Sequence, residues 1–290
     1  MTANVAPRPA AVQAAPLGYM CHSSPQKPRL VSAVAIYPHG IEVGSSFKSK
    51  AKRHNHTPVR GEINGFSAKA RNRMLWTART TDFAGFMAFL FLTLTYHDNW
   101  QGRDYQRDRD NFIKRLKRRY PDAVYLWRLE PQRRGAPHFH ILVMLPHAAD
   151  KDAISKDLPA QWHSLVDKGN IHHKKHGAKA VCLDSGYKGV CMYLSKYSAK
   201  IDASGASKTL KGKQWGKSKD WPSKPNMQVE LDDKAEAQLR RFLRALLKAR
   251  RNRSSLYANT IVQGHTSKVW LDKESEVLAV CRYVGTLKRE

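Results

Sequence analysis

The sequence predicts an α+β fold, and two observations carry that prediction. Four segments between residues 88 and 183 are rich in apolar, β-branched and aromatic residues over strand-like lengths. Other segments repeat apolar residues at helical spacing. The length of 290 residues allows one large domain or two small ones, and either can bury a sizeable core.

The most informative strand is Pro137–Leu145, because an unbroken apolar run follows His140. Residues i and i+2 of a strand share a face, so His138 and His140 present two imidazoles side by side while Phe139 points the other way. Such a pair on an exposed face is often just polar. Two imidazoles can also begin a metal site, with open positions left for a third ligand, water and substrate oxygens.

A second strand, Ala123–Glu130, comes just before it, and residues 131–136 between them have turn chemistry. We expect an antiparallel hairpin. If its loop closes symmetrically, Glu130 lies beside His138, within cross-strand reach. Glu130, His138 and His140 are therefore the candidate metal ligands. One carboxylate and two imidazoles with vacant positions suit Mg²⁺ or Mn²⁺ in a nuclease better than Zn²⁺.

The charge predicts a polyanionic partner. Lys and Arg number 51 against 24 Asp and Glu, which gives a formal charge of +27 spread along the chain. No apolar run reaches the roughly 18 residues that span a membrane, and we expect no secretion signal. The four cysteines form no CxxC pair, so we expect reduced thiols in a cytoplasmic protein.

From the N-terminus, residues 1–60 predict a disordered basic arm, in which Leu30–Ile36 could form one strand. Residues 61–201 follow as one domain. Ser67–Arg79 predicts a helix capped by Ser67. Ala88–Tyr96 predicts a strand that could lie beside the histidine strand, and its Thr93 and Thr95 would then border the site, although such threonines are more often ordinary strand residues.

Two further helical patterns cover Arg103–Tyr120, which is rich in basic residues, and Ala153–Lys168, in which Pro159 predicts a kink or a start. Between Asn170 and Gly177 we expect a basic, DNA-facing loop; its three histidines match no closed metal site. Lys179–Leu183 predicts a short strand.

A helix is expected from Gly189 onward, with Tyr193 and Tyr197 at i, i+4 on one face and Lys196 close to that face. A tyrosine pair at this spacing is usually packing. In a basic protein with a His-x-His strand, a tyrosine oxygen can also attack a phosphodiester and hold the 5′ phosphate covalently. A lysine could stabilise the developing charge.

Three motifs in this order resemble the HUH endonucleases, specifically the two-tyrosine rolling-circle replication initiators of small single-stranded DNA phages and plasmids. Phe91-Leu92-Thr93-Leu94-Thr95 is similar to their first motif, and His138-Phe139-His140 to the metal-binding second. Tyr193-Leu194-Ser195-Lys196-Tyr197 is similar to the third, and Glu130 stands where many members supply the third ligand. The resemblance covers roughly residues 85 to 201.

The resemblance implies a central antiparallel sheet of about five strands flanked by helices, with the histidines on a central strand. It also implies an enzyme that nicks and rejoins single-stranded origin DNA through Tyr193 and Tyr197, in the cytoplasm of a bacterial host. A relaxase or a transposase shares this chemistry, but a relaxase usually places its tyrosine before the histidines. A non-catalytic basic DNA binder fits the composition, although it has no chemical need for these residues.

Residues 202–290 predict a basic loop and a helical extension. The loop contains Trp215 and Trp221, which could stack on single-stranded DNA or pack internally. Asp232–Arg251 is a clear helical pattern, whereas residues 254–290 give no clear assignment. No Walker A motif is visible, so we expect a separate helicase and a host polymerase as partners.

Overall fold

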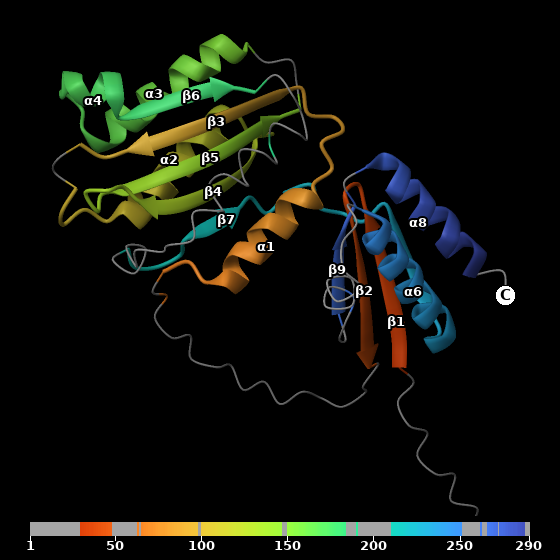
Figure 1. Cartoon of the computed structure of the whole chain (residues 1–290). Helices are drawn as coiled ribbons and strands as arrows, with labels where there is room; N and C mark the ends of the chain where they lie inside the picture. Colours follow the sequence, from red (N-terminus) through yellow and green to blue (C-terminus); the bar gives the residue numbers. More distant parts are fainter. Residues whose placement is uncertain are drawn as a thin grey trace, which may run out of the picture.

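The computed structural model describes residues 30–47, 63, 65–97, 100–146, 150–183, 190, 210–250, 262, 266–271 and 273–287. Within these ranges the chain forms two antiparallel sheets and six helices (Figure 1). The predicted α+β fold with a five-stranded antiparallel sheet and a C-terminal helix is confirmed. None of the helices in these ranges is long and apolar enough to cross a bilayer.

The five-stranded sheet carries the histidine strand at its centre, in the order β6-β3-β5-β4-β7. Its strands are β3 (Ala88–Thr95), β4 (Val124–Pro131), β5 (Pro137–Leu145), β6 (Ala178–Cys182) and β7 (Trp215–Lys217). The first four match the strands that the sequence predicts to within about two residues. β7 comes from beyond residue 201, where the sequence predicts a loop.

Both faces of this sheet are covered. Helices α2 (Tyr105–Arg119) and α3 (Lys151–Val166) bury one face, on which Phe139, Phe112 and Trp162 share a core. Met74 and Ala78 of α1 (Ala68–Arg79) pack on the other face. Ser67 caps α1 as predicted, with its side chain accepting a hydrogen bond from the Ala70 amide. Because a strand alternates its side chains, β5 contributes to both cores.

The second sheet was not foreseen. Its order is β8-β1-β2-β9, from β1 (Leu30–Tyr37), β2 (Gly40–Phe47), β8 (Met227–Leu231) and β9 (Thr266–Trp270). Helices α6 (Asp233–Ala249) and α8 (Glu274–Leu287) share a buried core with it. Residues 30–47 therefore form a hairpin within a sheet, which corrects the prediction of a disordered arm over that part of residues 1–60. The C-terminal segment adds strands as well as the helix expected near Asp232–Arg251.

Helix α1 contacts both sheets. Its Trp76 ring meets Tyr37 edge to face at 5.8 Å between ring centroids, and the Arg79 guanidinium lies 3.3 Å from the centroid of the Trp270 ring. Figure 1 shows α1 between the two sheets. The packing also shifts the boundary expected at residue 201, because β7 and the buried Trp221 belong with the five-stranded sheet.

Two predicted loops are ordered elements. Asn170–Gly177 contains α4 (Ile171–His176), which Asn170 caps through hydrogen bonds from the amides of His172 and His173. A cap of this kind begins a helix even where the helix itself is very short. In α3, Pro159 lies inside the helix and does not start it; Asp150 is the N-cap.

Candidate metal centre

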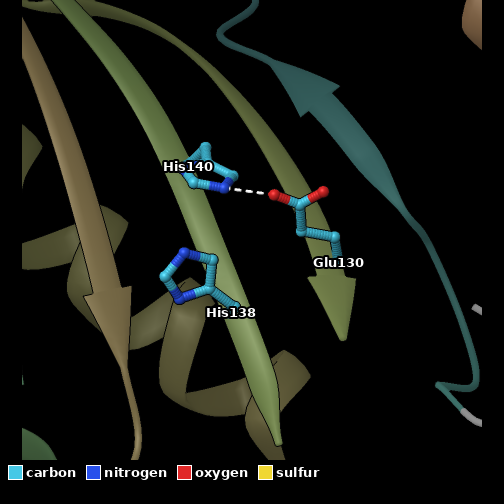
Figure 2. A group of neighbouring side chains, drawn as sticks. All are labelled: Glu130, His138 and His140. Carbon is cyan, nitrogen blue, oxygen red and sulfur yellow. Dashed lines mark hydrogen bonds and ion pairs between the residues drawn. The ribbon is translucent and has the colours of Figure 1, made fainter. Parts of the chain in front are cut away.

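Three side chains converge where β4 ends and β5 begins: Glu130, His138 and His140 (Figure 2). Each offers one ligand atom, and these atoms all lie within 4.8 Å of one another. The register places Glu130 directly opposite His138, as the symmetric hairpin predicted. Glu130 and His140 are buried, at 7% and 5% exposed, whereas His138 is half-buried. The cluster therefore has a buried side and a side that solvent or a substrate can reach.

The turn between the two strands fixes this register. Gly135 adopts φ +83°, a left-handed conformation that favours glycine, and its amide donates to the Gln132 carbonyl at 2.9 Å. The Gln132 amide in turn donates to the Ala136 carbonyl at 2.9 Å. A slip of one residue would turn both histidines to the opposite face, so the turn chemistry is what keeps the three ligands together.

Each histidine is held by different neighbours. The Nε2 atom of His140 contacts the Glu130 carboxylate, and its ring stacks on Phe91 at 5.5 Å between centroids. The Nδ1 atom of His138 lies 2.9 Å from the Thr95 hydroxyl on β3. Thr95 pairs with His138 and Thr93 with His140 in the β3–β5 register, so the predicted proximity of this threonine strand is confirmed.

The donor set fits a divalent cation. Ligand bonds of about 2.0–2.2 Å place two donors on one ion no more than roughly 4.4 Å apart, close to the separation in this cluster. Two imidazoles and one carboxylate leave coordination positions open for water or substrate oxygens, as a catalytic site requires. The geometry does not select among Mg²⁺, Mn²⁺ and Zn²⁺.

A buried arginine that the sequence analysis did not single out lies next to this cluster. Arg128 is 3% exposed and pairs with His140 across the β4–β5 register. Its guanidinium lies 3.5 Å from the centroid of the Phe66 ring and donates to the backbone carbonyl of Gln214 at 3.3 Å. Residues two apart on a strand share a face, so the position of Arg128 relative to Glu130 could have revealed it.

Tyr96, the tyrosine that directly follows Thr95, is unsuited to nucleophilic attack. It is 2% exposed, and its hydroxyl donates to Asp108 at 3.0 Å. Burial, followed by the nearby Asp108 carboxylate, raises the pKa of Tyr96 far above its ordinary value. The candidate nucleophiles Tyr193 and Tyr197, and the candidate Lys196, lie outside the described residues.

Two other sequence interpretations change with the structure. His173 is not a loop residue facing DNA, because it is 1% exposed and bonded to the Thr95 carbonyl. Trp221 does not offer a stacking platform, because it is 5% exposed and donates through Nε1 to the Thr81 hydroxyl at 3.0 Å. Both are structural residues of the core beside the cluster.

Comparison with known proteins places this site within a replication-protein region. Residues 89–202 match the model of a replication-associated protein family, which is described by its members ORF2 and the gene 2 protein. A replication-associated protein of Pseudomonas phage Pf3, which carries the same gene 2 protein name, is 26% identical over 222 residues. These cover 72% of this chain and 77% of that protein.

Two Xylella fastidiosa proteins, each named "Putative replication protein", are also similar. The one from strain Temecula1 is 28% identical over 214 residues, which cover 69% of this chain and 76% of its own length. The one from strain 9a5c is 28% identical over 217 residues, which cover 70% of this chain and 72% of its own length. Among solved structures, the hypothetical protein ORF119 from Sulfolobus islandicus rod-shaped virus 1 is 16% identical, with a TM-score of 0.29 over 46% of this chain and 97% of that one.

Proposed function

We propose that this protein initiates rolling-circle DNA replication, as an HUH-type endonuclease that nicks and rejoins single-stranded origin DNA through a 5′-phosphotyrosyl intermediate. The observation that carries the proposal is the convergence of Glu130, His138 and His140 on a central strand and its neighbour. The matched family region supports it, since residues 89–202 include these three ligands and also Tyr193, Lys196 and Tyr197. The names of the similar proteins point to replication as well.

In this proposal, Glu130, His138 and His140 hold a divalent cation, Mg²⁺ or Mn²⁺. Bound there, the cation would polarise a non-bridging oxygen of the scissile phosphate. The two buried ligands, Glu130 and His140, fix the ion against the sheet, and the half-buried His138 lies at the reachable side of the cluster.

The chemical step belongs to the tyrosines. The phenolic oxygen of Tyr193 or Tyr197 attacks the phosphorus and forms a P–O bond, while the bond from phosphorus to the 3′ oxygen breaks. The phenolic proton is lost, and the leaving oxygen takes up a proton to become the 3′-OH that primes synthesis. Lys196 stabilises the charge that develops on the phosphate or the phenolate.

The second tyrosine lets the reaction end cleanly. It would cut the regenerated origin after one round, and the released 3′-OH would attack the first phosphotyrosyl link and close the circle. The formal charge of +27 suits a protein that holds single-stranded DNA through these steps. A separate helicase and a host polymerase would supply unwinding and synthesis, in the cytoplasm of a bacterial host.

A cleavage assay tests this function. End-labelled single-stranded oligonucleotides that tile the origin region of the protein's own replicon would be incubated with the full chain and Mn²⁺ or Mg²⁺. We expect one strong cleavage position, lost with EDTA and in His140→Ala, and retained in His172→Ala, a histidine on the exposed side of α4. Tight binding without cleavage under all metal conditions would favour a non-catalytic DNA binder instead.

A further inference from the structure

Thr95 holds one of the proposed metal ligands, and the surrounding hydrogen bonds fix Thr95 in turn. Its hydroxyl lies 2.9 Å from Nδ1 of His138. An imidazole has two nitrogens, and the one that is hydrogen-bonded determines which one is presented to a metal. With Nδ1 directed to Thr95, the Nε2 atom of His138 is the one available to an ion.

The Thr95 backbone is fixed by three further hydrogen bonds. Its amide donates to the Gly177 carbonyl at 2.7 Å. Its carbonyl accepts from Nε1 of Trp162 at 2.9 Å and from Nε2 of His173 at 3.0 Å. Trp162 and His173 are 0% and 1% exposed, so both donors belong to the rigid core. Since a carbonyl can only accept, Nε2 of His173 carries a proton.

The close approach of His173 depends on Gly177. A Cβ atom at position 177 would lie 2.3 Å from Nε2 of His173, nearer than real Cβ contacts come. Two histidines from different segments, His138 on β5 and His173 on α4, therefore meet at the same threonine, one at its hydroxyl and one at its carbonyl.

We propose that Thr95 is a positioning residue of the metal centre: its hydroxyl accepts the Nδ1 proton of His138 and so keeps Nε2 deprotonated and aimed at the cation, while Trp162 and His173 hold Thr95 in place. This inference rests on the proposed function, because it concerns the same ligand set. It assigns α3 and α4 a second task, since their buried donors brace the strand end that supports the site.

Thr93 offers a matched control on the same strand. It is two residues from Thr95, on the same face, and pairs with His140 in the register. No hydrogen bond from its hydroxyl to a histidine is found among the described residues. Thr93→Val and Thr95→Val therefore make the same chemical change next to the two histidines, but only the second removes a hydrogen bond to one of them.

The test is a Mn²⁺ titration of the full chain, followed by the electron paramagnetic resonance signal of free Mn²⁺, with thermal unfolding of each variant recorded alongside. We expect Thr95→Val to weaken Mn²⁺ binding about 10-fold or more, in the range known for residues that orient metal ligands. Thr95→Ser, which keeps the hydroxyl, should recover most of the affinity, and Thr93→Val should bind like the wild type.

Two outcomes overturn the inference in distinguishable ways. If the wild type binds Mn²⁺, His140→Ala does not, and Thr95→Val binds as tightly as the wild type, Thr95 does not position the ligand while the metal centre itself stands. If the wild type binds no more Mn²⁺ than His140→Ala does, the metal centre of the proposed function is wrong, and the role of Thr95 is wrong with it.

Discussion

The Glu130 carboxylate contacts Nε2 of His140 directly, although the register of the hairpin pairs Glu130 with His138. The contact is thus diagonal across the two strands, which is within the reach of long side chains. It brings the carboxylate close to both imidazoles at once. This relationship underlies the view that the three residues act as one ligand set.

Replacing Glu130 with Gln should weaken metal binding while keeping the shape of the side chain. The amide carries no charge and is a poor ligand for a hard cation, so we expect a loss of Mn²⁺ affinity of at least about 10–100-fold, the range for residues that merely support ligands. Calorimetric titration with Mn²⁺ measures it. Arg133→Gln, at an exposed position in the adjoining turn, is the control that should leave Mn²⁺ affinity unchanged. Equal affinities for Glu130→Gln and the wild type would remove Glu130 from the ligand set.

Gly177→Ala should destabilise the five-stranded sheet. The backbone at Gly177 is ordinary, with φ −73°, so the cost is steric: the new methyl group would meet the His173 ring. Overpacking of this kind costs about 1–3 kcal/mol of unfolding free energy. Urea denaturation measures this loss.

Gly285→Ala is the matched control for that substitution. Gly285 lies inside α8 with no atom within 4 Å of the position that a Cβ would occupy. Alanine there should be neutral or stabilise by up to about 1 kcal/mol, because it favours a helix. If the two variants unfolded at the same urea concentration, the close packing at Gly177 would be contradicted.

Glu236→Ala should destabilise the second sheet strongly. Glu236 and Arg240 of α6 form a buried ion pair, with Nε of Arg240 donating to Glu236 at 2.6 Å, and Glu236 also accepts from the Ser32 hydroxyl. Arg240 reaches Ser267 of β9 at 2.7 Å, so the network ties α6 to two strands. Removing one partner of a buried pair costs about 3–5 kcal/mol.

Chemical denaturation followed by circular dichroism measures that effect. Asp233→Ala is the control, because Asp233 is exposed in the first turn of the same helix and contributes about 0.3–1 kcal/mol there through the helix dipole. A loss for Glu236→Ala no larger than for Asp233→Ala would show that the network does not stabilise the docking of α6.

The site could be predicted from the sequence because its determinants are local. The spacing of His138 and His140 sets their common face, and the turn chemistry of residues 131–136 sets the register that brings Glu130 to them. Thr95 entered through the alternation of its own strand. Arg128 was missed because a single basic residue in an apolar strand gives no signal of its own unless its face is compared with that of Glu130.

The second sheet could not be predicted because its pairings are distant in sequence. β1 near the N-terminus pairs with β8, so residues Ala33 and Glu230 become neighbours. Each strand is short, and the basic segment after Phe47 made the surrounding composition look like an arm. Likewise β7 has only three residues, too few for any periodicity, and its place is set by tertiary packing, with Gly216 lying against the Trp127 ring.

The covalent intermediate tests the central claim most directly. Single-stranded origin DNA labelled on the 3′ side of the cleavage position would be incubated with protein and Mn²⁺, and the products would be separated on a denaturing protein gel. We predict a labelled band at the mass of the protein plus DNA, absent when EDTA is present from the start. It should persist in at least one of Tyr193→Phe and Tyr197→Phe and disappear in the double variant, with DNA binding nearly intact. A labelled adduct that survives in the double variant, or no adduct at all with the wild type despite tight DNA binding, would contradict the account.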